Sequence, residues 1–338
     1  MKKKELFLVL GIVLALLIFI AYQFISSTQG GFAANEKIVY INEDIAPEEI
    51  EAQLKADSII SDIQSFELLV KLKSINKFKS GRYKIPKGIS TNALLNKFRT
   101  GLQDPILVKV DGVRNVYQLA GTLDAQLKFD STSFIQAILS NEVLLPRGLK
   151  PEEAMTLILP NTYELFWNIN PKTFMDKMIE ISDAYWNEDR LNKAEALALK
   201  ASEVYTLASI VKGETVTKSE APKIAGLYLN RLKKNMALEA DPTITFALNL
   251  KKAQRVYHKD LIVDSPYNTY KNRGLPPGPI FMVEPLYLDA VLEAENHEYL
   301  FMCAQPGGTG LHNFAKDYAK HQLYASLYRS WLNKNNIR

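Results

Sequence analysis

Residues 197–215 read LALKASEVYTLASIVKGET. Val204, Leu207 and Val211 recur at the three- and four-residue spacing of one helix face, and Glu214 is the next position on that face. A carboxylic acid at the end of an apolar stripe is partly desolvated if the helix extends that far. Desolvation raises the pKa of a carboxyl group toward the range that a general acid needs near neutral pH. The stretch therefore predicts a buried helix that ends in a candidate catalytic acid.

Two observations qualify this interpretation. Gly213 permits another backbone or a ligand to approach Glu214 closely, which favours a functional site. Glu203 lies on nearly the same helical line, however, so periodicity alone does not choose between the two acids. A glutamate near a helix end that points to solvent, or bonds a neighbouring backbone group, is the structural alternative for Glu214.

A proline-rich stretch downstream predicts a stiff wall. Residues 264–285, DSPYNTYKNRGLPPGPIFMVEP, hold five of the 15 prolines, and each proline locks its own φ angle. Tyr267, Asn268 and Tyr270 stand in this stretch, where aromatic rings suit the faces of a sugar and amides suit its hydroxyl groups. The alternative is a connection packed for its own sake, although long ordered loops are usually functional.

Smaller features add further candidates. Pro242 fixes the chain after Asp241, so Asp241 either caps the next helix or meets a ligand hydroxyl. His312 follows a glycine-rich turn and either contacts substrate or bonds that turn. The run 299–304 predicts a buried strand in which Cys303 is a small core residue rather than a nucleophile.

Composition excludes several classes of protein. The chain has 338 residues, is 47% hydrophobic and carries a net charge of only +4, from 41 basic and 37 acidic side chains. A nucleic-acid binder that works by neutralising phosphates is therefore not expected. One cysteine and four scattered histidines provide no disulfide and no zinc-ligand spacing. No nucleotide-binding glycine motif occurs either. From these two patterns together we expect no metal and no cofactor.

The N-terminus predicts a membrane anchor. Residues 6–25 form an apolar run long enough to span a bilayer, and Lys2, Lys3 and Lys4 before it place residues 1–5 in the cytoplasm. A cleaved secretory signal is the alternative, with Ala33 and Ala34 at the cleavage site, but the apolar run is longer than such signals usually have. Residues 26–35 read as a short tether. Either interpretation exports the rest of the chain, and the anchor places it at the outer face of the cytoplasmic (inner) membrane, in the periplasm or outside the cell.

The exported part predicts an α+β fold. Strands at 38–41 and 81–86 flank helices at 47–60 and 65–75, which makes a compact βααβ unit, and a helix at 90–99 and a strand at 106–110 follow. Two further helices are expected between 115 and 145, and residues 177–331 are mostly helical apart from the proline-rich stretch. We therefore expect a small domain at 36–105 and a helix-rich mixed domain at 106–338.

Several strings, in this order, resemble the YceG-like family of endolytic peptidoglycan transglycosylases (the MltG type). They are LPNTYE (159–164), ASIVKGET (208–215), NRL (230–232), DPT (241–243), SPYNTY (265–270), GLPPGPI (274–280) and HNF (312–314). The resemblance covers nearly the whole chain and implies that 36–105 is a LysM-like subdomain and 106–338 the catalytic domain. Two departures occur. Lys212 replaces one of two glutamates in the catalytic motif, and residues 281–285 lack the family's usual Asn-Pro-Gly.

The resemblance assigns the catalytic role to Glu214, the glutamate that remains in register. It implies cleavage of the β-1,4 bond between MurNAc and GlcNAc of nascent peptidoglycan, with 1,6-anhydro-MurNAc ends as product and termination of strand growth as the role. A single acid suffices because the C6 hydroxyl of the sugar is the nucleophile, whereas hydrolytic glycosidases use two carboxylates. The substrate-binding residues expected are Asp241, Thr243, Tyr267, Asn268, Tyr270, Glu164 and His312.

Two rival functions remain. One is a hydrolytic muramidase with Glu239 or Asp241 as the second carboxylate. The other is a non-catalytic peptidoglycan-binding scaffold, which the presence of Lys212 allows. The expected partners are peptidoglycan glycan strands, the inner membrane and peptidoglycan synthases, with no nucleic acid.

Overall fold

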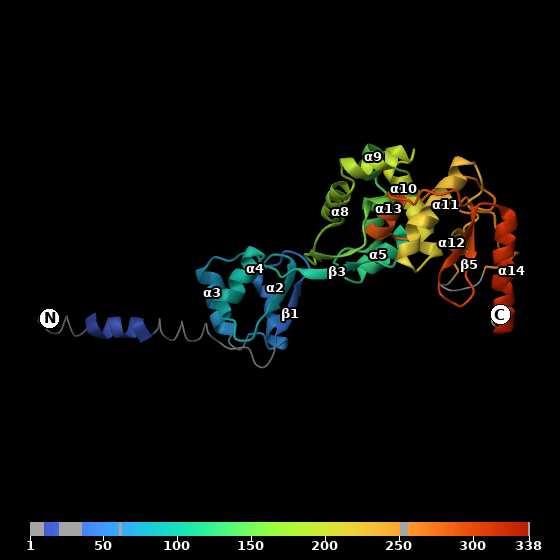
Figure 1. The fold of residues 1–338 in the computed structure, drawn as a ribbon. Coiled ribbons are helices and arrows are strands. Elements are labelled where there is room, and N and C mark those ends of the chain that lie inside the picture. Colours follow the sequence, from blue (N-terminus) through green and yellow to red (C-terminus); the bar gives the residue numbers. More distant parts are fainter. Residues whose placement is uncertain (1–9, 20–35, 61–62, 251–255, 337–338) are drawn as a thin grey trace, which may run out of the picture. The chain divides into compact units, whose positions relative to one another are not determined.

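The computed structural model describes residues 10–19, 36–60, 63–250 and 256–336, which form two units (Figure 1). The first unit comprises residues 1–108 and 164–169, and the second comprises residues 109–163 and 170–338. Residues 164–169 thus return to the first unit, and the domain boundary expected between 105 and 106 stays a prediction. The mixture of helices and small sheets confirms the α+β class.

The first unit has the expected order of strand, two helices, strand and helix. Its elements are β1 (Lys37–Ile41), α2 (Pro47–Ala56), α3 (Ile63–Leu72), β2 (Gly81–Ile85) and α4 (Thr91–Thr100). Strands β1 and β2 are antiparallel, with Val39 opposite Tyr83, and both side chains are fully buried. The likeness of this unit to a LysM domain stays a prediction.

Helix α4 illustrates how local sequence sets these elements. The Ser90 hydroxyl accepts a hydrogen bond from the Ala93 N–H at 3.2 Å and caps the start of the helix. Gly101 ends it with φ 73°, a left-handed conformation that glycine adopts without strain. Leu94, Leu95 and Phe98 then lie fully buried on one face, as their spacing predicts.

A second two-stranded sheet consists of β3 (Ile106–Val110) and β4 (Asn161–Leu165), and the division between the two units falls within these strands. The second unit is mostly helical. Its remaining elements are α5 (Val116–Asp124), α6 (Ser131–Ile138), α7 (Asn141–Leu144), η1 (Leu145–Arg147), η2 (Pro151–Leu157), α8 (Pro171–Tyr185), α9 (Glu188–Ala196), α10 (Ala201–Glu214), η3 (Lys218–Glu220), α11 (Ala221–Lys233), α12 (Asp241–Ala247), α13 (Pro285–Leu292), β5 (Phe301–Ala304), β6 (His312–Ala315) and α14 (Tyr318–Lys334).

Helix α10 lies at the centre of the second unit. It packs against α11 and α13 (Figure 1), and every side chain from Val204 to Val211 is buried. The Glu203 carboxylate caps the start of the helix by accepting the Lys200 N–H at 2.8 Å. The helix extends to Glu214 as its last residue, so the apolar stripe does carry this acid to its end.

Two expectations about the C-terminal part have different outcomes. Among the described residues between α12 and α13 there is no helix or strand, as the prolines of 264–285 predict, and the stiffness of this stretch stays a prediction. The buried strand expected at 299–304 is wrong in its burial, because all four residues of β5, Cys303 included, are only half-buried. Among the described residues, strands β5 and β6 form a two-stranded sheet, against which helix α14 packs.

The expected anchor falls mainly on residues outside the described ones. Residues 10–19 are helical, and in the described part of the chain no helix is long and apolar enough to cross a membrane. The expected span at 6–25 therefore stays a prediction, and the tether at 26–35 lies outside the described residues.

Candidate active site

Glu214 lies half-buried at the C-terminal end of α10 and is held by a tyrosine from the neighbouring helix. The Tyr228 hydroxyl, on α11, donates a hydrogen bond to Glu214 Oε1 at 2.7 Å. Tyr228 itself is only 2% exposed, so its ring is fixed by the core. Because Oε1 already accepts this bond, the second carboxyl oxygen, Oε2, is the atom left to carry and donate a proton.

The surroundings of Glu214 shift its proton affinity in the direction that acid catalysis needs. The pKa of Glu214 is raised to about 7, mainly by burial among protein atoms, and the negative charge of Asp241 acts in the same direction. The Tyr228 hydrogen bond and the positive charge of Arg231 oppose this rise in pKa. A half-accessible carboxyl group that is close to half-protonated at neutral pH is a suitable general acid.

Asp241 and Tyr270 form a second hydrogen-bonded pair at this site. The Tyr270 hydroxyl donates to Asp241 Oδ1 at 2.6 Å. Burial and the Asp241 carboxylate raise the pKa of Tyr270 well above its usual range, so the hydroxyl stays protonated and remains a donor. Asp241 opens α12 with an exposed side chain, and Ala240 occupies the N-cap position. Asp241 therefore is not the cap of the next helix, which was one of the two roles expected.

Gly213 brings these two carboxylates together. An added Cβ at Gly213 would lie 2.6 Å from Pro242 Cβ, closer than such atoms approach, and would make an unusually tight contact of 3.1 Å with Phe281 Cε2. The absence of a side chain thus allows the end of α10 to contact the start of α12. This close approach explains why a glycine directly precedes the candidate acid.

Arg231 is buried on α11 and joins several segments around the site. Its guanidinium donates to the carbonyl groups of Leu300, Ala237 and Leu238 at 2.6–3.0 Å and pairs with Glu239 at 2.9 Å. Because Glu239 is committed to this ion pair, it is a less suitable second catalytic carboxylate than Asp241. Neither Arg231 nor Tyr228 is among the catalytic and substrate-binding residues that the sequence analysis names.

Thr243 and Asn268, both expected to bind substrate, are fully buried. The Thr243 hydroxyl donates to Ala240 O at 2.7 Å and lies 2.8 Å from the Thr269 hydroxyl. The Asn268 amide donates to Leu261 O and Val263 O and accepts the Tyr270 N–H, at 2.8–2.9 Å. Their contacts are typical of residues that hold the loop bearing Tyr270 and the turn bearing Asp241.

The other expected residues lie in varied surroundings. Tyr267 packs against Phe246 with ring centroids 4.7 Å apart, and burial raises the pKa of its hydroxyl to about 12. His312 bonds Glu220 twice, through its backbone N–H at 2.9 Å and its Nδ1 at 3.0 Å, which ties β6 to the start of α11. Glu164 is exposed on β4 and belongs to the first unit, whereas Glu214 belongs to the second, so a role of Glu164 in substrate binding stays a prediction.

Lys212 lies on a different side of α10 from Glu214. Its Nζ donates to Met282 O at 2.6 Å and pairs with Glu284 Oε2 at 2.7 Å. Residues that are two positions apart in an α-helix, such as 212 and 214, are separated by about 200° around the helix axis. The lysine therefore stabilises the loop before α13 and does not contact the candidate acid.

Comparison with known proteins identifies the family of this chain. The YceG-like family matches residues 39–326. A protein of Bacillus subtilis (strain 168) named endolytic murein transglycosylase is 29% identical over 306 residues, which cover 83% of this chain and 81% of that protein. A protein of the same name from Streptococcus pneumoniae (strain D39) is 26% identical over 82% of this chain but only 56% of its own length.

A solved structure supports the fold. The crystal structure of a yceG-like protein from Listeria monocytogenes matches with a TM-score of 0.56 and 24% identity, over 86% of this chain and 99% of that one. A solved yceG-like protein shares the fold. Because the family matches most of the chain, this chain belongs to the YceG-like family.

Proposed function

We propose that this chain cleaves the β-1,4 bond between MurNAc and GlcNAc in nascent peptidoglycan and that Glu214 is the acid. The chain belongs to the YceG-like family, and its relatives are named endolytic murein transglycosylase, so it is a lytic transglycosylase. The observation that carries the residue assignment is the half-buried Glu214 carboxyl group, with its pKa raised to about 7 and one oxygen held by Tyr228.

The proposed cycle uses one carboxyl group twice. Glu214 Oε2 donates its proton to the glycosidic oxygen, the bond from MurNAc C1 to that oxygen breaks, and positive charge develops at C1. The nearby Asp241 carboxylate, held by Tyr270, stabilises this charge electrostatically. The C6 hydroxyl of the same MurNAc then attacks C1 and returns its proton to Glu214. A 1,6-anhydro end forms and no water is consumed.

The cellular setting is part of the proposal. An anchor at residues 6–25 would hold the catalytic body at the outer face of the cytoplasmic membrane, where new glycan strands emerge. Peptidoglycan synthases are the partners that this position favours. Cleavage there would terminate strand elongation.

The experiment digests uncrosslinked glycan with the full chain in detergent and identifies the ends by mass spectrometry. Anhydro ends support the proposal, and products that are one water heavier indicate a muramidase, which the exposed Asp241 near Glu214 keeps as the second candidate. The absence of cleavage would indicate a binding scaffold. Glu214→Gln should reduce the rate by about 10²–10⁴-fold, and a variant that still makes anhydro ends at the wild-type rate would refute the assignment of the acid.

A further inference from the structure

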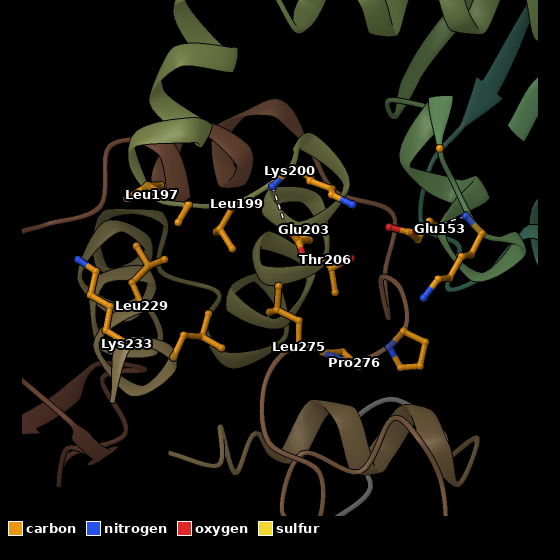
Figure 2. Close-up of a pocket in the computed structure, with 15 residues that line it drawn as sticks. Glu153, Leu197, Leu199, Lys200, Glu203, Thr206, Leu229, Lys233, Leu275 and Pro276 are labelled. Carbon is orange, nitrogen blue, oxygen red and sulfur yellow. Dashed lines mark hydrogen bonds between the residues drawn. The ribbon is translucent and has the colours of Figure 1, made fainter. Parts of the chain in front are cut away.

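A cavity of about 530 Å³ lies in the second unit, and neither Glu214 nor Tyr228, Asp241 or Tyr270 lines it. Figure 2 shows leucine side chains from the α9–α10 connection, from α11 and from the proline-rich loop converging on it. Its apolar wall consists of Leu197, Leu199, Leu229, Leu232, Leu275 and Pro276. Part of the GLPPGPI string, which the Glu214 cluster does not use, thus forms one side of this cavity.

Three exposed lysines, Lys150, Lys200 and Lys233, also line the cavity. Within the described residues, no salt bridge involves any of the three side chains. The two acids at the cavity are already engaged, because Glu153 accepts the Lys150 N–H at 2.9 Å and Glu203 accepts the Lys200 N–H at 2.8 Å. The cavity therefore combines an apolar wall with ammonium groups that are available to a negatively charged ligand.

The cavity and the candidate acid lie at opposite ends of one helix. Glu203 lines the cavity near the start of α10, and Glu214 ends the same helix. At 1.5 Å per residue the two positions are about 16 Å apart along the axis. A peptide of four or five extended residues spans about 13–18 Å, so a chain attached to a sugar at Glu214 has the length to reach the cavity.

We infer that this cavity binds the peptide stem of the MurNAc residue whose bond is cleaved, an assignment that rests on the proposed function. The stem is a short extended peptide whose alanine methyl groups suit the apolar wall of leucine and proline side chains. Its free carboxylates suit Lys150, Lys200 and Lys233. Binding of the stem would fix the position of the sugar at Glu214 and would make the enzyme prefer glycan that still carries its peptides.

The test compares two substrates that differ only in the stem. One is uncrosslinked glycan bearing L-Ala-D-Glu-diaminopimelate-D-Ala, and the other is the same glycan after an amidase has removed its peptides. The full chain should have a higher kcat/KM for the first by about tenfold, the size expected of three exposed charge contacts. The variant Lys150→Gln/Lys200→Gln/Lys233→Gln should lose this preference and cleave stripped glycan at the wild-type rate.

A matched control replaces three exposed lysines outside the cavity, Lys259, Lys320 and Lys334, with glutamine and should keep the preference. Calorimetric titration of the Glu214→Gln protein provides a readout without turnover, since it should bind the stem-bearing glycan more tightly. If the wild-type enzyme cleaves the two substrates at equal rates, the inference is overturned and the proposed function stays intact. A triple lysine variant that keeps the preference would have the same consequence. If the cavity instead binds an acidic segment of a partner protein, the wild-type enzyme should cleave the two substrates at equal rates. If the wild type cleaves neither substrate, the proposed function fails and this assignment fails with it.

Discussion

Gly213 and Pro242 are in contact across two helices, because a Cβ on residue 213 would lie only 2.6 Å from Pro242 Cβ and 2.8 Å from its Cγ. Pro242 follows Asp241, and Gly213 precedes Glu214. The spacing of the two carboxylates therefore depends on a position without a side chain. The proline ring is rigid, so it cannot give way by rotating a side chain.

Gly213→Ala should consequently push α12 away from α10 and displace Asp241. We expect kcat/KM to fall by about 10–100-fold, since a shift near 1 Å in a catalytic group has an effect of this size. The free energy of unfolding should fall as well, although glycine to alanine within a helix ordinarily raises it by about 0.5–1 kcal/mol. Gly121→Ala in α5 is the matched control, because open space surrounds its added Cβ. Equal stability gains in both variants would contradict the contact.

The raised pKa of Glu214 implies a cost to stability that depends on pH. Its pKa is 4.5 in a solvated chain and about 7 in the folded protein, so the folded state binds the proton more tightly. Between these two values the stability contributed by this group falls as pH rises. Glu214→Gln removes the charge, and it should be more stable than the wild type at pH 8 by about 1–3 kcal/mol, but not at pH 4. Thermal unfolding at the two pH values measures this difference, and a variant equally stable to the wild type at pH 8 would count against a buried acid.

Tyr228→Phe should move the pH profile of cleavage toward higher pH. The hydrogen bond from Tyr228 lowers the pKa of Glu214, so its loss raises that pKa and keeps the acid protonated further into the alkaline range. The rate itself should fall by about tenfold, because the carboxyl group loses a positioning contact.

The matched control for Tyr228→Phe is Tyr205→Phe. Tyr205 is also a buried tyrosine, but its hydroxyl bonds Ile158 O and the Val283 N–H and does not contact Glu214. The control should lose stability and leave the alkaline limb of kcat/KM in place. A limb that does not move in Tyr228→Phe would exclude the proposed hydrogen bond.

Local sequence predicts this protein well where one element decides the outcome. The apolar spacing of Val204, Leu207 and Val211 leads to a helix that ends at Glu214, and the prolines after residue 264 lead to an irregular wall. Both outcomes depend on backbone preferences and burial over short stretches. The same reasoning could not find Tyr228, although a tyrosine on an otherwise apolar face indicates a hydroxyl that needs a partner.

Features that depend on packing between distant segments were not predictable. Thr243 and Asn268 have side chains suited to sugars, but hydroxyl and amide groups serve a loop's own backbone equally well, and burial decides between the two uses. The contact of Gly213 with Pro242 joins two helices, and no periodic pattern records it. The return of residues 164–169 to the first unit is likewise a property of the folded chain.

Lys212→Gln should leave catalysis nearly unchanged. The lysine contacts Met282 O and Glu284 rather than Glu214, so we expect kcat/KM within about threefold of the wild type and a loss of about 1 kcal/mol in stability. Cleavage of uncrosslinked glycan and denaturant unfolding measure the two effects. A loss of activity as large as that of Glu214→Gln would place the departure from the family motif in the chemistry instead.

Asn268→Ala separates a positioning role from direct contact with sugar. The Asn268 amide donates to two carbonyl groups and accepts the Tyr270 N–H, all while fully buried, so its removal should lower stability by about 2–4 kcal/mol. Because Tyr270 then loses its support, the partner of Asp241 moves and kcat falls. Asn272→Ala, an exposed amide in the same loop, should change stability by no more than about 1 kcal/mol. If Asn268→Ala instead kept its thermal stability and raised only KM, the residue would contact the glycan directly, because a positioning role requires both losses together.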